Sequence, residues 1–188
     1  LDGSLTIGNS DTDTIVVNNG TQDLENPWVG GINAGQVSTI ELNGDFLPDL
    51  FVFDRTDNNV ITYLNKGTLG TPDYVHAPEY ESIFPSDIRH WCVLRDYNCD
   101  GLKDIWGYTS GGIMVYENIG TPGNVQFDKV SNLVMSFYDT MELNLYVSST
   151  DIPSIDDIDG DGDMDVVTFS ILGANLEYHR NLSMETSV

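Results

Sequence analysis

An acidic segment near the end of the chain, IDDIDGDGDMDVV at residues 155–167, places aspartates at fixed intervals and then continues directly into valines. A tight loop with this spacing directs alternate side-chain oxygens toward one centre, and hard oxygen ligands of this kind suit Ca2+. Without a cation, each close pair of carboxylates would repel by roughly 1 kcal/mol in bulk water and roughly 4 kcal/mol at a partly shielded site. We therefore expect a divalent metal site rather than a solvated acidic turn. Relative positions one, three, five, six and nine are held by Asp157, Asp159, Asp161, Gly162 and Asp165.

The residues that follow this loop favour a β-strand. Helix–loop–helix calcium sites begin with the same D-x-D-x-D-G pattern but end with a glutamate at position twelve, where this chain has Thr168. The segment DVVTF, which begins at Asp165, is rich in β-branched and aromatic residues, as strands are. The sequence therefore predicts a strand–loop–strand metal site.

Two further copies of the loop occur earlier in the chain, IELNGDFLPDLFVF and RDYNCDGLKDIW, and the residues at position five of the three copies lie 55 and 61 residues apart. In the first copy Phe46 stands where the other two have glycine, and phenylalanine does not easily adopt the positive φ that glycine permits. We expect this first site to be distorted and to bind metal weakly or not at all, while its loop still connects two strands. The first copy offers Glu41, Asn43, Asp45 and Asp49, and the second offers Asp96, Asn98, Asp100 and Asp104.

A tyrosine follows each loop at a similar distance, and an N-x-G turn follows the first two of these tyrosines. Tyr63, Tyr116 and Tyr178 lie 14, 12 and 13 residues after the last acid of their loops. Each unit reads as strand, acidic loop, strand, turn, strand, N-x-G turn and last strand, and four short strands at this spacing suggest the blades of a β-propeller. A β-sandwich is the main rival. The expected all-β chain is an incomplete or open propeller of about three units: a partial blade at 1–36, blades at 37–90 and 91–150, and a partial blade at 151–188.

The loops and the N-x-G turns together resemble FG-GAP and VCBS repeats, the calcium-binding blades of integrin α-chain propellers and of many secreted bacterial surface proteins. The resemblance covers roughly residues 37–182 and is most specific in the second and third copies. It implies a calcium-binding propeller whose ligands are the acidic and amide side chains named above. It also implies that the backbone carbonyls of Leu102 and Asp163 complete the second and third sites.

The composition limits the partners that the protein can have. Its 188 residues, 40% of them hydrophobic, are enough for one domain with a core. A net charge of −23, from 30 acidic and 7 basic residues, argues against nucleic acid or an anionic membrane as partner, because both require clusters of Lys and Arg. No apolar run reaches membrane-spanning length, so no membrane insertion is expected. This acidity is typical of calcium-loading extracellular proteins, with a merely soluble acidic protein as the alternative.

The cysteines and the first residue bear on where the protein is found. Cys92 and Cys99 either form one disulfide, which an oxidising compartment would permit, or remain two free thiols. The sequence leaves both possibilities open. The chain starts at Leu1 without a signal peptide, so we expect it to be processed or cut from a longer protein. A secreted, extracellular or cell-surface location is expected.

Catalysis is not expected. The three histidines, His76, His90 and His179, are scattered without a metal-binding spacing or a nucleophile motif, and a carboxylate bound to calcium is a poor general acid. The leading hypothesis is a calcium-stabilised propeller that acts as a non-catalytic scaffold, adhesion or protein-interaction module with a protein or glycan partner. The alternatives are a glycan-binding module and an accessory propeller of a secreted polysaccharide-acting enzyme.

Overall fold

The computed structural model describes residues 5–6, 16–23, 30–138 and 140–184. The chain divides into two compact units, Leu1–Ile32 and Asn33–Val188. In the first unit, β1 (Leu5–Thr6) pairs antiparallel with β2 (Val16–Val17). Asn18 Oδ1 then accepts a hydrogen bond from the N–H of Gly20, so an N-x-G turn is also present here.

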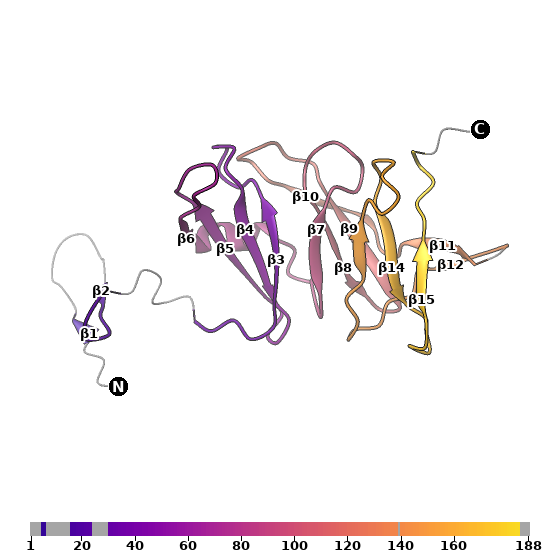
Figure 1. Cartoon of the computed structure of the whole chain (residues 1–188), viewed down its shortest axis with the longest axis horizontal. Coiled ribbons are helices and arrows are strands. Elements are labelled where there is room, and N and C mark those ends of the chain that lie inside the picture. Colours follow the sequence, from indigo (N-terminus) through magenta and orange to yellow (C-terminus); the bar gives the residue numbers. More distant parts are fainter. Residues whose placement is uncertain (1–4, 7–15, 24–29, 139, 185–188) are drawn as a thin grey trace. The chain divides into compact units, whose positions relative to one another are not determined.

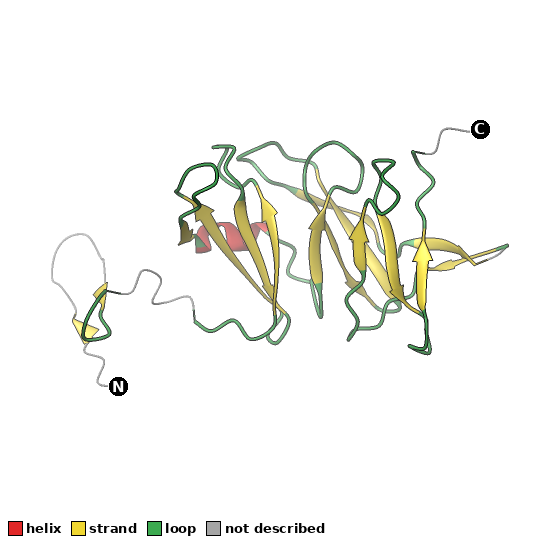
Figure 2. Cartoon of the chain, viewed as in Figure 1, coloured by secondary structure: helices red, strands yellow, loops and turns green. Residues whose placement is uncertain are grey.

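The second unit is built from antiparallel sheets, which confirms the all-β class (Figures 1 and 2). Its described residues contain one 3₁₀ helix, η1 (Pro78–Ile83), and a two-stranded hairpin of β11 (Met135–Tyr138) and β12 (Met141–Asn144). The first sheet contains β3 (Gly35–Ile40), β4 (Asp49–Asp54), β5 (Asn59–Asn65) and β6 (Tyr74–His76). The second contains β7 (Cys92–Arg95), β8 (Asp104–Thr109), β9 (Gly112–Asn118) and β10 (Phe127–Ser131). The third contains β13 (Ser154–Asp156), β14 (Asp165–Phe169) and β15 (Leu176–His179).

Each acidic loop joins the first two strands of a sheet. The residue before the loop pairs with the acid at position nine in all three sheets: Ile40 with Asp49, Arg95 with Asp104, and Asp156 with Asp165. The strand that follows is apolar and buried, as in DLFVFD of β4. The strand–loop–strand prediction is therefore confirmed for all three copies.

The three sheets pack face to face in chain order (Figure 1). Because side chains alternate between the two faces of a strand, Phe51 and Phe53 of β4 lie on one face, and they join a core cluster with Ile105 of the second sheet. Trp106, the next residue of β8, lies on the opposite face and joins a second cluster with Val166 of the third sheet. The second sheet is therefore covered on both faces.

Side chains also connect the first strands of successive sheets. Gln36 Oε1 accepts a hydrogen bond from Cys92 N–H at 3.0 Å, and Ser38 Oγ accepts one from Leu94 N–H at 3.1 Å. Arg95 Nε donates to the carbonyl of Ile155 at 2.8 Å. These bonds satisfy backbone groups that edge strands would leave unpaired.

Both cysteines are free thiols, which decides between the two states that the sequence left open. Cys92 lies buried in β7, while Cys99 is exposed in the second acidic loop. Burial raises the pKa of the Cys92 thiol well above its usual range. Among the residues described, no helix is both long and apolar enough to cross a bilayer.

The N-x-G turn requires its glycine for steric reasons. In the first two sheets the Asn side chain accepts hydrogen bonds across the turn: Asn65 Oδ1 from the N–H groups of Gly67 and Asp73, and Asn118 Oδ1 from those of Gly120 and Gln126. A Cβ atom at either glycine would lie 2.2 Å from a backbone carbonyl oxygen on the other side of the turn. The motif thus fixes a tight turn after the third strand in these two sheets.

We predict that Gly120→Ala lowers the free energy of unfolding by about 1–3 kcal/mol, because the added methyl group overpacks against backbone that cannot move aside. Urea unfolding followed by circular dichroism measures the change. Gly31→Ala is the matched control, since a Cβ there meets nothing within 4 Å. Equal stabilities of the two variants would contradict this explanation of the turn.

Candidate metal centre

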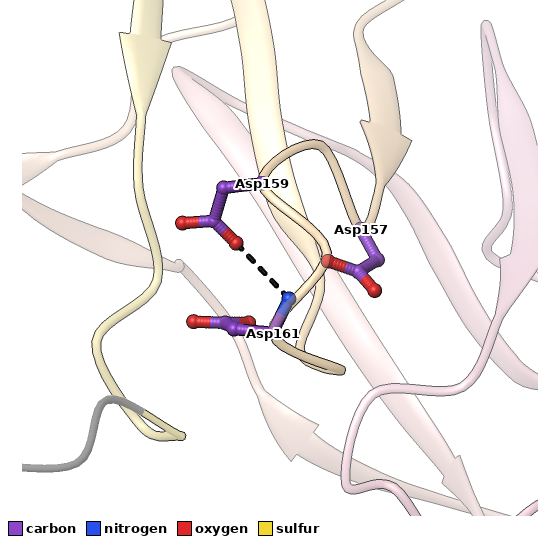
Figure 3. A group of neighbouring side chains, drawn as sticks. All are labelled: Asp157, Asp159 and Asp161. Carbon is purple, nitrogen blue, oxygen red and sulfur yellow. Dashed lines mark hydrogen bonds between the residues drawn. The ribbon is translucent and has the colours of Figure 1, made fainter.

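The third acidic loop gathers three carboxylates. One oxygen from each of Asp157, Asp159 and Asp161 lies within 4.8 Å of the others (Figure 3). No other group of three or more His, Cys, Asp or Glu side chains meets this criterion in the portion of the chain that the structure describes. These residues occupy positions one, three and five of the loop, so the alternating geometry expected from the sequence is present.

Backbone N–H groups hold these carboxylates in place. Asp157 accepts hydrogen bonds from the N–H groups of Gly160 at 2.8 Å and Gly162 at 3.2 Å. Asp159 accepts one from Asp161 N–H at 3.3 Å, as Figure 3 shows, and Asp161 accepts one from Asp163 N–H at 3.1 Å. Each of the last two bonds spans two residues, which is the local turn that Asp side chains favour.

Two carboxylate oxygens in this loop are buried without a hydrogen-bond partner among the described residues, Asp161 Oδ2 and Asp163 Oδ1. An unsatisfied buried acceptor is costly, and more so when it is charged. The N–H of Asp163 lowers the pKa of Asp161, but burial and the neighbouring carboxylates outweigh it, so that pKa is raised. The loop therefore holds negative charge that it does not itself neutralise.

Two contacts of this loop were not expected from the sequence. Arg180 Nε lies 2.5 Å from Asp159 Oδ2 and supplies a positive charge. Asp163, for which the resemblance implied only a carbonyl ligand, has a buried side chain whose Oδ2 accepts hydrogen bonds from Ser183 Oγ and Met184 N–H. Both contacts come from residues after β15, and no local motif signals them.

The second loop repeats the pattern with fewer charges. Asp96 accepts hydrogen bonds from the N–H groups of Asp100 and Gly101, and Asp100 Oδ1 accepts one from Leu102 N–H. Asn98 Nδ2 donates to Asp100 Oδ2 at 3.1 Å and to Glu117 Oε1 of β9 at 3.0 Å. Glu117 is thus an additional acid beside the loop that the spacing argument missed.

Position six of the first loop has the same positive-φ backbone conformation as in the other two loops, although it holds a phenylalanine. Phe46 adopts φ 62°, of the same sign as Gly101 at 89° and Gly162 at 105°, and its side chain is 80% exposed, so the ring meets little obstruction. The cost of placing a side-chain-bearing residue there is about 1–2 kcal/mol. Hydrogen bonds offset part of this cost: Glu41 Oε1 accepts from the N–H groups of Asn43 and Gly44, Asn43 Oδ1 from Asp45 N–H, and Asp45 Oδ1 from Leu47 N–H.

The acids at position nine have a shared structural role that the sequence did not reveal. Asp49, Asp104 and Asp165 are each 0% exposed, and we call them the clamp aspartates. One oxygen of each accepts the N–H of loop position two, at Leu42, Tyr97 and Ile158. The other accepts the N–H of an asparagine at or just after the end of the third strand: Asn65 and Asn118 are the last residues of β5 and β9, and Asn181 lies two residues after β15.

The clamp explains why an acidic loop recurs with an asparagine after the third strand, which begins an N-x-G turn in the first two sheets. A single carboxylate joins the loop, the second strand and the exit from the third strand. Burial raises the pKa of Asp49 and of Asp104, although the backbone donors act in the opposite direction. A carboxylate oxygen has two lone pairs, so a clamp oxygen with one hydrogen bond can also bind a metal ion. In Asp165, Oδ2 accepts bonds from both Ile158 N–H and the Tyr178 hydroxyl, which leaves Oδ1 for that role.

A second polar group lines an open cavity of about 690 Å³ between the second sheet, the β11–β12 hairpin and the third sheet. Ser136 Oγ lies 2.7 Å from His179 Nδ1, and Glu177 Oε2 lies 3.7 Å from His179 Nε2. Burial lowers the pKa of His179, so the imidazole is neutral at pH 7. The Ser136 contact ties the hairpin to β15, and the separation of His179 from Glu177 is too long for a hydrogen bond.

We predict that Asp104→Ala lowers the free energy of unfolding by about 3 kcal/mol, because two buried N–H groups, of Tyr97 and Asn118, lose their acceptor. Asp104→Asn keeps one acceptor oxygen and is expected to lose less. Urea denaturation measures both variants against Asp128→Ala, which removes an exposed carboxylate and is expected to change stability by less than about 0.5 kcal/mol. A loss at position 104 no larger than that of the control would refute the clamp.

The three loops therefore combine a repeated structural clamp with a set of oxygen ligands, which is most acidic in the third copy. Such an arrangement can bind a hard cation. A comparison of the chain with protein-family models, with curated proteins and with solved structures finds no match.

Proposed function

We propose that the chain is a calcium-stabilised module of the β-propeller type, which acts as a non-catalytic scaffold, adhesion or protein-interaction module of an exported or cell-surface protein. The observation that carries the proposal is the third loop, where three carboxylates converge and two buried carboxylate oxygens lack partners. A cation at that point would neutralise the charge and supply the missing interaction. Asp157, Asp159 and Asp161 would hold it, with Asp163 and Asp165 beside them.

Calcium fits this group better than magnesium does. Ca2+ accepts six to eight oxygens at 2.3–2.6 Å in flexible geometry, so ligands on opposite sides of the ion are about 5 Å apart. Three oxygens within 4.8 Å of one another can therefore share one ion without unfolding the loop. Mg2+ requires an octahedral shell at 2.0–2.1 Å and gives up its waters reluctantly. The second loop, with Asp96, Asn98 and Asp100, is proposed as a further site, and the first as a weaker one.

The propeller assignment is supported by the repetition of one sheet design. Three sheets in the described residues carry an acidic loop between their first two strands and stack in series. A sandwich places two sheets against each other, whereas a sheet covered on both faces by its neighbours is typical of radial repetition. Closed propellers use four to eight such sheets. The FG-GAP and VCBS resemblance supports the same assignment.

An exported location follows from the chemistry of the proposed ion. Extracellular calcium modules bind with Kd values of about 10⁻⁴–10⁻³ M, an affinity that loops with few carboxylates can reach. The net charge of −23 keeps the protein apart from anionic surfaces and suits a protein or glycan partner.

We predict that Ca2+ raises the melting temperature by roughly 5–10 °C relative to a chelator when the ion exceeds its Kd about 100-fold, since binding to the folded state alone then contributes about 2.7 kcal/mol. Mg2+ is expected to restore little of this shift. Differential scanning calorimetry on the full chain measures the effect. No shift with Ca2+ would contradict the proposal.

Replacement of a ligand should separate metal binding from general stability. Asp161→Asn is expected to abolish most of the calcium shift while leaving the chelated protein at least as stable, because it removes carboxylate repulsion in the loop. Asp45→Asn should reduce the shift less, and Asp128→Asn not at all. Calorimetry with Ca2+ and with chelator compares the four proteins, and an unchanged shift in Asp161→Asn would place the ion elsewhere.

Glycan binding is a second candidate function, favoured by the cavity described above. Its wall includes Tyr97, Trp106 and Tyr178, and Trp106 Nε1 is buried without a hydrogen-bond partner among the described residues. Aromatic faces next to polar groups suit sugars. If glycan binding is the function, titration calorimetry with neutral oligosaccharides gives saturable heat that is lost in Tyr97→Ala and kept in Tyr74→Ala. Absence of binding in the unmodified chain leaves the scaffold function.

A further inference from the structure

In the first and second sheets, one face packs against the next sheet along the chain. We call this face, and the equivalent face of the third sheet, the forward face. It carries the third and fifth residues of the strand that follows the acidic loop. In the first sheet these residues pack into the core shared with the second sheet, and in the second sheet they pack into the core shared with the third. The pairs are Phe51 and Phe53 in β4, Trp106 and Tyr108 in β8, and Val167 and Phe169 in β14.

The forward face of the third sheet is apolar but belongs to neither core cluster of the described residues. Phe169 is 43% exposed, whereas Phe53 at the same position of the first sheet is 0% exposed. Leu176, which pairs with Phe169, is 65% exposed, whereas Ile113 at the same position of the second sheet is 0% exposed. Contiguous exposed apolar side chains of this kind mark interaction surfaces.

The third sheet also has a serine at the register position that makes a polar contact in the first sheet. Ser38 pairs with Phe51 and accepts the N–H of Leu94 from the next sheet at 3.1 Å. Ser154 pairs with Val167 in the same register, and it is exposed. The forward face of the third sheet thus presents both the apolar surface and the hydroxyl acceptor that the first sheet uses to bind its neighbour.

The matching surface lies on the opposite face of the first sheet, its backward face. In the second sheet, the face that receives Phe51 and Phe53 includes Cys92 and Ile105. Val37 and Leu50 hold the same register positions in the first sheet, and Val37 is 62% exposed. Val52 and Ile61 of the same face are already buried within the chain, so Val37 and the half-buried Leu50 are the part of this face that a further sheet can cover.

We propose that the forward face of the third sheet binds the backward face of the first sheet in a second copy of the chain. This inference rests on the repeated sheet stacking of the proposed function and continues the interface between neighbouring sheets. The contact is heterologous, so it closes into a ring or extends into a filament. Three sheets from each of two copies make six, which lies within the four to eight of closed propellers.

The net charge of the chain determines how the proposed association depends on salt concentration. Each copy carries a net charge of −23, so two copies repel at low ionic strength. Salt at about 0.15 M shortens the screening length to about 8 Å and leaves apolar contacts in place. Association driven by these faces therefore strengthens with added salt, whereas pairing driven by surface ion pairs weakens.

Sedimentation equilibrium of the full chain over a range of concentration and salt tests the proposal. We expect concentration-dependent dimers, with Leu176→Asp and Val37→Asp each weakening self-association at least tenfold. Mixing these two variants should restore one interface, because each retains the face that the other lacks. Leu69→Asp is the control, since Leu69 is 87% exposed in a turn away from both faces.

A chain that stays monomeric at every concentration and salt would overturn the proposal. So would a dimer that Leu176→Asp disrupts while Val37→Asp does not, since that pattern indicates two copies of the same face in contact. Circular dichroism verifies that each variant is folded. The calcium-dependent melting shift of the same variants reports on the proposed function separately, because neither substitution touches an acidic loop.

Discussion

The fold of this protein depends on a buried carboxylate that accepts two backbone N–H groups from different parts of a sheet. Asp49, Asp104 and Asp165 each make this contact, and all three are excluded from solvent. Burying a charge is costly unless it is fully hydrogen-bonded, so the clamp stabilises only the one arrangement in which loop and third strand meet. Because the same clamp recurs, each sheet begins with the same geometry and can stack on the one before it.

The metal proposal follows from this constraint. The clamp aspartate at position nine ends the loop between the first two strands, so the loop is short. Within it, side-chain oxygens accept hydrogen bonds from backbone N–H groups two residues further along the chain. That pattern brings the carboxylates of the third loop together at an electrostatic cost. A divalent cation would offset this cost, and the same ion would stabilise the folded sheet over the unfolded chain. Loop geometry, sheet stacking and cation affinity are thus linked through one repeated residue.

The sequence predicted the elements whose signals are local. Spacing of acids, β-branched runs after them and the N-x-G turns were enough for the strand–loop–strand units. The sequence did not predict the hydrogen bonds of the clamp aspartates, because an aspartate at position nine has the same spacing whether it binds a metal ion or backbone N–H groups. Arg180, Glu117 and the side chain of Asp163 reach the loops from positions that only the folded chain brings close. Phe46 adopts a positive φ because its exposed side chain allows that conformation at modest cost.

Hydrogen–deuterium exchange of individual amides tests the clamp most directly. The N–H groups of Asn65, Asn118 and Asn181 lie at strand exits, where exchange is ordinarily fast, yet each donates to a buried carboxylate. The account predicts that they exchange as slowly as amides in the middle of β4 and β8. Exchange of these three amides as fast as that of exposed turn residues such as Leu69 would contradict it.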